Sequence, residues 1–435
     1  MKKIKVALLG CGNRGKIYAD YSLRYPEQME VVAVIDQNNF KLEQAKKRYS
    51  ITSDMAFSSL DEFISKKIPC DLVIDAVLDG MHFITAKKLL IAGYDILLEK
   101  PITQNLDELL ELKDLANTNN CNVFVCHVLR YTPFYSRIKK LIHDGELGEI
   151  YSMELDEHVW MVHFVASYVR GKYHNEKESG SPLLLAKCSH DADLMCWFNN
   201  DTSPAKVSSF GSRRKFRLEN KPEGASDFCY KCKFVDTCEY SAKRMHLDFK
   251  FFDFLTWVKL AKPLDEITRE EKEEHLKTDN YGRCVYDAGC DVVDRQTVAV
   301  EFENGSVGTL TVVGGVPCGE RYISISGEKG EIKGYFEEGV INLYKLTIDE
   351  NNQYKIVKKK FDVNEEIDST GDSGHGGGDF AIMNSVLKYI NGERGDLSIT
   401  SINDSIKGHL VCFAAEKSRK EGRIVSIDEI VSSRN

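Results

Sequence analysis

The first 36 residues hold a strand, a glycine-rich turn, a helix and a second strand in close succession. Residues 5–9 are a short apolar run, and Gly10-Cys11-Gly12-Asn13-Arg14-Gly15 follows it with the spacing G-x-G-x-x-G. Apolar residues then recur at helical spacing, and a β-branched run at 31–35 ends at Asp36. This order predicts the first unit of a parallel sheet with helices packed on its faces.

The glycines and the aspartate of this unit each suit the binding of a dinucleotide. Gly10 permits the tight turn, Gly12 lets the backbone approach a pyrophosphate, and Gly15 lets the helix pack closely on the strand. The start of the helix offers free N–H groups to the phosphates. Asp36 can accept hydrogen bonds from a ribose diol, which favours NAD, while Arg14 leaves NADP open. The alternative is a glycine turn without a nucleotide, and the complete context disfavours it.

Length and composition predict a globular chain of two domains. The sequence has 435 residues, with 42% hydrophobic and 29% charged, as in ordinary globular proteins. The net charge of −9 includes no basic block, which argues against a nucleic-acid partner, and no apolar run reaches membrane-spanning length. The 13 cysteines suit reduced thiols, and Met1 leads almost directly into the first strand. We therefore expect a cytoplasmic protein.

Alternating strands and helices continue to about residue 128. Apolar strand patterns lie at 71–77, 94–98 and 121–128, with helical patterns between them, so residues 1–128 are predicted to form a doubly wound parallel sheet. Glu99-Lys100-Pro101 follows the strand at 94–98, at the edge where such sheets bind ligands. A partly desolvated lysine there suits acid–base chemistry. The alternative for Lys100 is a solvated side chain at a strand end.

From residue 129 to 435 the pattern changes to that of an α+β domain. Strand patterns at 148–155, 205–212, 297–302, 306–313, 322–326, 331–335 and 340–346 predict one large, mainly antiparallel sheet. Residues 218–290 are charged and contain cysteines, and we interpret them as an insertion.

A predicted helix at 181–197 places Lys187, His190 and Asp191 on one face. The imidazole of His190 could exchange a proton with a hydroxyl group near neutral pH, although a lone helical histidine is often structural. Upstream, His163, Tyr168 and Arg170 belong to a polar and aromatic mixture that suits a polyol, or else form a surface loop.

Several of these motifs together resemble one protein family. Residues 10–15, Asp36, Glu99-Lys100-Pro101 and the His190-x-x-Asp193 pair are similar to motifs of the Gfo/Idh/MocA oxidoreductases, along nearly the whole chain. The resemblance implies that Lys100 lies between nicotinamide and substrate, that His190 is the second catalytic group, and that the open sheet carries oligomer contacts. It departs from the family at Ala186, where an aspartate is usual, which makes Lys187 a candidate substitute.

The resemblance and the residues together define the predicted site. Catalytic roles are predicted for Lys100, His190 and Lys187. The cofactor is predicted to contact Gly10, Gly12, Asn13, Arg14, Gly15, Asp36, His82, Glu99, Lys100 and Pro101. The substrate is predicted to contact His163, Tyr168, Arg170, Asp191 and His375, the last in a glycine-rich segment that resembles the entry to a late family helix.

The insertion contains Cys229-x-x-Cys232-x5-Cys238, and Cys284 or Cys290 could provide a fourth sulfur. Such spacing suits tetrahedral zinc or an iron–sulfur cluster. We predict structural zinc on Cys229, Cys232, Cys238 and Cys284; reduced thiols and a redox switch are the alternatives.

We thus expect an NAD(P)-dependent oxidoreductase that moves hydride between nicotinamide and a secondary alcohol of a sugar, glycoside or cyclic polyol. A glycoside cleaver that recycles NAD and a non-catalytic dinucleotide sensor remain alternatives. The expected partners are a small-molecule substrate and further copies of the chain, as a homodimer or homotetramer.

Overall fold

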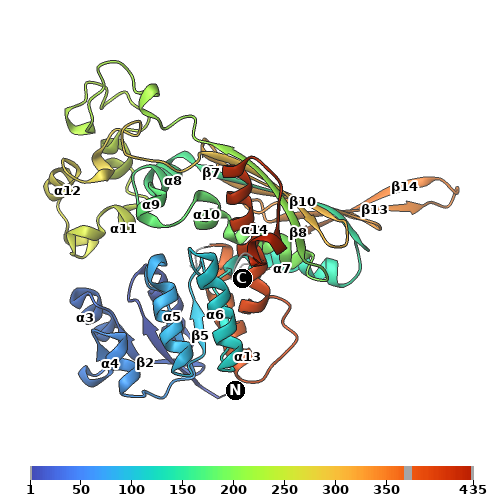
Figure 1. Ribbon diagram of the computed structural model, residues 1–435, viewed down its shortest axis with the longest axis horizontal. Coiled ribbons are helices and arrows are strands. Elements are labelled where there is room, and N and C mark those ends of the chain that lie inside the picture. The colour runs from blue at the N-terminus through green and yellow to red at the C-terminus, as the bar shows by residue number, and fades with distance from the viewer. Residues whose placement is uncertain (1, 367–374, 433–435) are drawn as a thin grey trace.

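A computed structural model describes residues 2–366 and 375–432 and contains two sheets (Figure 1). The first has six parallel strands in the order β3-β2-β1-β4-β5-β6. Its strands are β1 (Ile4–Leu9), β2 (Met29–Ile35), β3 (Ala56–Phe57), β4 (Leu72–Asp75), β5 (Ile96–Leu98) and β6 (Val123–Val125). Its helices are α1 (Asn13–Ala19), α2 (Tyr21–Arg24), α3 (Asn39–Arg48), α4 (Leu60–Ser65), α5 (His82–Ile91) and α6 (Leu106–Thr118). The predicted doubly wound parallel sheet is confirmed.

Apolar runs explain the central strands of this sheet. Every residue of β4 and β5 is buried, as expected for strands covered by helices on both faces. The side chain of Asn105 accepts hydrogen bonds from the backbone N–H groups of Asp107 and Glu108, which fixes the start of α6. Strand β3 was not predicted, because two residues carry no readable periodicity.

The second sheet has nine strands in the order β14-β13-β12-β11-β7-β10-β9-β8-β15. Only β7 and β10 pair in parallel, so the predicted mainly antiparallel sheet is confirmed. Its strands are β7 (Ile150–Trp160), β8 (Pro204–Ser212), β9 (Arg295–Phe302), β10 (Val307–Val316), β11 (Glu320–Gly327), β12 (Glu331–Tyr335), β13 (Val340–Ile348), β14 (Tyr354–Asp362) and β15 (Val425–Ser426). Strand β14 was missed because its lysine-rich sequence has no buried face to produce alternation.

Two long helices, α10 (Leu183–Phe198) and α14 (Ile402–Glu421), pack against each other between this sheet and the first domain (Figure 1). Their backbones approach closely at Gly408, where a Cβ atom would lie 2.7 Å from the Asp193 nitrogen. Shorter helices complete the layer: α7 (Pro133–His143), α8 (Met161–Phe164), α9 (Glu176–Ser179) and α15 (Ile427–Ser432). No described helix is long and apolar enough to cross a membrane.

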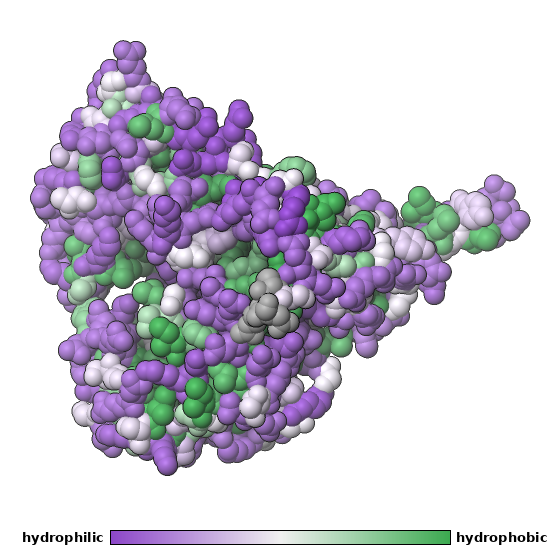
Figure 2. Space-filling view, viewed as in Figure 1, coloured by the Kyte–Doolittle hydropathy of each residue, from purple (hydrophilic) through white to green (hydrophobic). Residues whose placement is uncertain are grey.

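The segment between β8 and β9 forms a separate lobe (Figure 1). It contains α11 (Asp253–Thr256), α12 (Arg269–Leu276) and several short helical turns. A small core holds the lobe together, made of Ala242, Leu247, Trp257, Ile267 and Leu276. The segment predicted as an insertion thus has its own packing. Figure 2 shows a hollow between this lobe and the first domain, and a hairpin of β13 and β14 that projects from the opposite end.

The chain returns to the first domain near its end. Helix α13 (Gly378–Ile390) buries Ile382 and Met383 in the same cluster as Val6 and Leu8 of β1. A division of the chain at residue 128 therefore misses one helix that packs on the nucleotide sheet, because sequence order alone does not reveal a late return.

A buried ion pair holds the start of the second domain to α10. Arg130, just after β6, donates from Nε and Nη2 to the two oxygens of Asp193 on α10, at 2.7 and 2.6 Å. Both side chains are buried, so each charge depends on the other for compensation. The aspartate of the His190-x-x-Asp193 motif therefore fixes the helix that carries His190.

Replacing Arg130 with Met should leave the Asp193 charge buried and unpaired. We expect the free energy of unfolding to fall by about 3–5 kcal/mol, measured by urea denaturation at pH 7. Glu62→Ala, which removes an exposed partner of Lys66, should change it by less than about 0.5 kcal/mol. Equal stabilities of the two variants would contradict a structural role for the buried pair.

Candidate active site

The glycine loop is shaped by close backbone contacts on one side and open space on the other. Gly10 has φ +87°, and a Cβ atom there would lie 2.6 Å from the Ala76 carbonyl oxygen. A Cβ atom at Gly15 would collide with the Gly10 carbonyl oxygen, whereas one at Gly12 would meet nothing within 4 Å. The loop is therefore fixed beneath and accessible above Gly12, as a pyrophosphate cradle requires.

Asp36 lies beside this loop at the end of β2. Its Oδ2 accepts a hydrogen bond from the Cys11 backbone N–H at 2.8 Å, and its Oδ1 accepts one from the Asn38 N–H at 2.8 Å. Each oxygen keeps a second lone pair, so the carboxylate can still bind a ribose diol. The open space and the carboxylate together fit a dinucleotide.

Arg14 is held by two carboxylates. Its Nε donates to Glu99 Oε1 at 2.7 Å, and its Nη2 donates to Asp379 Oδ1 at 2.8 Å. Burial is the largest effect on Glu99 and opposes its ionisation, but the charge and hydrogen bond of Arg14, the charge of Lys100 and the Tyr18 hydrogen bond together lower the pKa of the carboxyl. Glu99 Oε2 also accepts the Lys100 backbone N–H at 2.8 Å. Asp379, which the sequence did not reveal as a partner, anchors the start of α13 to the nucleotide loop.

His82 has a structural contact at the same edge. It is fully buried, and its Nδ1 lies 2.7 Å from the carbonyl oxygen of Pro101, which follows Lys100 through a cis peptide bond. The histidine thus holds the Glu99-Lys100-Pro101 turn to the start of α5. The cofactor contact predicted for His82 gains no support from this geometry.

Lys100 is half-buried where the two domains meet. Its Nζ donates a hydrogen bond to the Ala186 carbonyl oxygen on α10 at 2.8 Å. Burial lowers the pKa of Lys100, and the charges of Glu99 and Asp79 compensate only in part. Lys100 therefore loses its proton more easily than a solvated lysine does.

His190 is buried on α10, one helical turn beyond Ala186. Burial, then the charge of Lys100, lowers its pKa well below the usual range, so the ring is neutral at pH 7. Its Nδ1 has no hydrogen-bond partner within the described part of the chain. The rings of His127 and His375 lie 5.5 and 6.2 Å from it, centre to centre. A buried ring nitrogen without a partner suits a ligand hydroxyl.

Lys187 belongs to a chain of alternating charges. Its Nζ lies 3.0 Å from Glu157 Oε1, Arg321 contacts Glu157 at 2.5 Å, and Arg321 Nε donates to Asp191 Oδ1 at 3.1 Å. Burial raises the pKa of Asp191 to about 6. Its Oδ2 has no described partner and can accept from a substrate. Glu157 and Arg321 were missed, since a charged residue on a strand carries no local sign of its partner.

The other residues predicted to contact the substrate lie in different surroundings. His163 lies near Lys187, and burial followed by the charge of that lysine lowers its pKa to about 3. Tyr168 is buried in a stack, with ring centres of Phe164 and Tyr173 each 5.5 Å away. His375 Nδ1 lies 3.2 Å from Asp379 Oδ2, close to the Arg14 network. Asp79, which was not predicted, bridges the domains through Lys172 at 2.6 Å.

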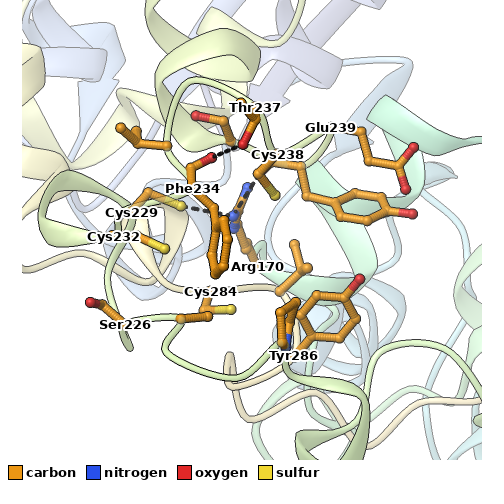
Figure 3. A pocket seen from close by; sticks show the side chains of 16 residues that line it. Arg170, Ser226, Cys229, Cys232, Phe234, Thr237, Cys238, Glu239, Cys284 and Tyr286 are labelled. Carbon is orange, nitrogen blue, oxygen red and sulfur yellow. Dashed lines mark hydrogen bonds between the residues drawn. The ribbon is translucent and has the colours of Figure 1, made fainter.

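Arg170 points into the insertion instead of toward a substrate (Figure 3). Its Nε donates to the Arg283 carbonyl at 2.7 Å, and its Nη2 donates to the Tyr240 carbonyl at 2.9 Å and lies 3.4 Å from Cys229 Sγ. These contacts do not support the predicted substrate role. Arg170 instead ties the insertion to the segment after α8.

The four candidate metal ligands line one cavity of about 270 Å³ around Arg170 (Figure 3), namely Cys229, Cys232, Cys238 and Cys284. Across residues 2–366 and 375–432, however, no group of three or more His, Cys, Asp or Glu side chains could hold a metal ion. The sequence spacing brought the thiols to one cavity wall but not to one point, and a guanidinium lies against Cys229. The predicted zinc site is therefore not supported.

Two family models match the chain. One described as "Oxidoreductase family, NAD-binding Rossmann fold" matches residues 4–127, and one described as "Oxidoreductase family, C-terminal alpha/beta domain" matches residues 139–427.

The individual relatives have low sequence identity to this chain. The putative oxidoreductase YteT of Bacillus subtilis is 22% identical over 374 residues, covering 82% of this chain and 81% of the relative. Inositol 2-dehydrogenase of Corynebacterium glutamicum is 23% identical over 201 residues, covering 45% of this chain and 54% of the relative, little more than half its length. The crystal structure of an Agrobacterium radiobacter oxidoreductase in complex with NAD+, L-tartaric acid and magnesium has a TM-score of 0.68 at 13% identity, covering 98% of this chain and 99% of the other. That likeness shows the shared fold.

The buried histidines predict how stability depends on pH. His409 accepts the Ile102 N–H at Nε2, 2.9 Å away, and burial lowers its pKa to about 3. An unfolded histidine has a pKa near 6.5, so between about pH 6.5 and 3 the unfolded chain binds the extra proton. The free energy of unfolding should therefore fall as pH decreases through this range, by up to about 1.4 kcal/mol per pH unit for this residue.

Urea denaturation at pH 7, 6 and 5 measures that slope. His409→Gln cannot titrate, so its slope should be smaller than that of the wild type even if its stability at pH 7 is lower. A slope unchanged in His409→Gln would contradict the assignment.

Proposed function

The chain belongs to the Gfo/Idh/MocA family of NAD-binding oxidoreductases, and from this premise we propose that it is a dehydrogenase for a secondary alcohol of a sugar, glycoside or cyclic polyol. The inositol 2-dehydrogenase relative supports this substrate class. The observation that carries the proposal is the meeting of Lys100 and His190 at the ligand edge of the parallel sheet.

Both groups have depressed pKa values there, and both have capacity for a ligand. Lys100 uses one of its three Nζ donor positions on Ala186, and His190 Nδ1 has no described partner. Two groups whose pKa values are both lowered can share the proton of a substrate hydroxyl.

We assign the proton of the oxidised hydroxyl to Lys100. In its neutral form, the amine accepts that proton. His190 donates a hydrogen bond to the same oxygen and so stabilises the negative charge that develops on it. NAD, when bound, supplies the redox chemistry by accepting the hydrogen of the carbon with its electron pair. Lys187 is a positioning residue in this proposal, because it acts through Glu157 and Arg321 on Asp191.

NAD is the proposed cofactor in preference to NADP. Asp36 carries a negative charge where NADP has its 2′-phosphate, and the two would repel each other. Arg14, which could have bound that phosphate, is occupied by Glu99 and Asp379. The proposed cofactor contacts are Gly10, Gly12, Asn13, Gly15 and Asp36, with Lys100 at the nicotinamide end.

We further propose that the protein is a homo-oligomer. The hairpin of β13 and β14 projects from the body (Figure 1), and Leu346 pairs with Ile356 beside Ile348 and Tyr354. These four side chains are 63–80% exposed. A two-stranded ribbon is only marginally stable in water, which supports coverage of its apolar face by a second copy of the chain.

The test of the function is the appearance of NADH when NAD and a panel of sugars, inositols and glycosides are added to the protein. We expect substrate-dependent absorbance, and Lys100→Met should lower kcat/KM at least about a hundredfold because the proton acceptor is lost. NAD affinity of this variant should change far less than kcat/KM, because Lys100 meets only the nicotinamide end of the proposed cofactor site. Lys66→Met, an exposed lysine after α4, is the matched control and should retain full activity.

Full activity in Lys100→Met would contradict the assigned role of Lys100. Consumption of a glycoside that requires NAD but yields no net NADH would instead favour redox-assisted glycoside cleavage.

Replacing Asp36 with Ala removes the carboxylate that would bind the ribose. The Kd for NAD, measured by calorimetric titration, should rise about 10- to 100-fold, which corresponds to the loss of a charged hydrogen bond. Asp61→Ala removes an exposed carboxylate on α4 and should leave the Kd unchanged. An unchanged Kd for NAD in Asp36→Ala would contradict the proposed ribose contact.

A further inference from the structure

An exposed aromatic surface lies at the edge of the insertion. It combines Trp160, at the end of β7, with Phe249 and Phe251 from a segment about 90 residues later in the chain. The Trp160 ring centre lies 5.7 Å from that of Phe249 and 5.8 Å from that of Phe251, and the two phenylalanine rings stack at 6.0 Å. Phe249 is 49% exposed and Phe251 60%. We call these three residues the aromatic platform.

The platform is continuous with the candidate active site. Phe251 contacts the buried Phe252 at 4.9 Å between ring centres, and Phe252 contacts His163 at 5.3 Å. His163 in turn lies beside Lys187, whose charge acts directly on it. A line of aromatic rings therefore runs from the charged residues around Asp191 to the outer surface of the lobe.

The same segment also reaches the cofactor side. The Asn13 side-chain amide donates a hydrogen bond to the Phe254 carbonyl oxygen at 3.4 Å, next to the glycine loop. Residues 249–254 thus cross the opening between the nucleotide loop and the substrate residues. Figure 2 shows this opening as a hollow with hydrophobic residues on its rim.

The segment is held firmly enough to act as a binding surface. Asp253 Oδ2 accepts a hydrogen bond from Lys272 Nζ at 2.9 Å, and the Lys272 ammonium also lies 5.2 Å from the Trp257 ring centre. Trp257 is part of the small core of the lobe. A ligand that stacks on the platform would therefore bind a surface that is already ordered, which lowers the entropy cost of binding.

We propose that the aromatic platform is an outer subsite that binds a second sugar ring of a glycoside substrate, beyond the ring that is oxidised. This inference rests on the proposed function, because it places the oxidised ring between Lys100 and His190. Flat aromatic rings pack against the C–H face of a sugar, while their half-exposed setting leaves the sugar hydroxyls in water. The absence of charge on all three side chains favours a neutral sugar over a phosphorylated or acidic one.

The experiment compares matched pairs of a monosaccharide and its disaccharide, such as glucose with cellobiose or maltose and galactose with lactose. The full-length protein loaded with NAD is used, and NADH absorbance gives kcat/KM for each sugar. For the pair that is turned over, we expect the disaccharide to have the higher kcat/KM by about tenfold. Phe251→Ala should abolish that advantage and leave the monosaccharide within about twofold, whereas Phe251→Tyr should retain it.

Phe210→Ala is the matched control, because Phe210 is also an exposed phenylalanine (77%, against 60% for Phe251) but lies on β8, outside the aromatic line. A disaccharide advantage that persists in Phe251→Ala, or that never exists in the wild type, would overturn the subsite.

Failure of the proposed function would give a different result. If no sugar yields NADH, binding of the same disaccharides is measured by quenching of tryptophan fluorescence. Saturable binding that is lost in Phe251→Ala and retained in Phe210→Ala would support the platform without the dehydrogenase activity. No binding of any disaccharide would overturn the platform itself.

Discussion

The hydrogen bond from Lys100 Nζ to the Ala186 carbonyl oxygen connects the nucleotide sheet to the helix that carries His190. The acceptor is a neutral carbonyl, so it fixes the position of Nζ without adding an opposite charge that would favour the protonated lysine. An aspartate side chain at residue 186 would favour the charged lysine by direct attraction. With Ala186 in that place, burial dominates and the pKa of Lys100 falls. The departure from the family motif therefore changes the electrostatics of the site while it keeps the contact between the domains.

The remaining charges of the site compensate one another in two separate networks. Arg14 is shared by Glu99 and Asp379, and Arg321 is shared by Glu157 and Asp191, with Lys187 at the end of the second network. Buried charges are costly unless they are paired, so each network fixes its members in one arrangement. Lys100 and His190 belong to neither network, and burial is the largest cause of the lowered pKa of each.

The sequence predicted the parts of this arrangement that depend on neighbours along the chain. The glycine loop, Asp36 and the position of Lys100 after a strand follow from local periodicity and spacing, and the two sheets follow from the change of period near residue 129. Contacts between distant segments could not be predicted in this way. Asp379 lies 365 residues from Arg14, and Arg321 lies 130 residues from Asp191, so neither partner leaves a local pattern.

The cysteines and Arg170 also show the limit of prediction from local sequence patterns, because here the patterns suggested contacts that the structure does not contain. The Cys229-x-x-Cys232 spacing made a metal site reasonable, and Arg170 lay close to residues that suit a polyol, yet both belong to the wall of one cavity in the insertion. Local spacing constrains which residues are neighbours on a turn, but the direction of each side chain depends on what packs around it. Here Arg170 finds carbonyl oxygens and a thiol inside the lobe, and these contacts anchor the insertion at its base.

That anchoring gives the insertion a defined place in the catalytic cycle that we propose. Its base is held by Arg170, its middle by a small apolar core, and its far segment touches the nucleotide loop at Asn13 and the substrate side at His163. The proposed reacting groups, Lys100 and His190, lie just after β5 and on α10, outside the insertion. In the function and subsite that we propose, chemistry and recognition belong to different parts of the chain, so the insertion sets which substrate extends from the site without altering the groups that move the proton.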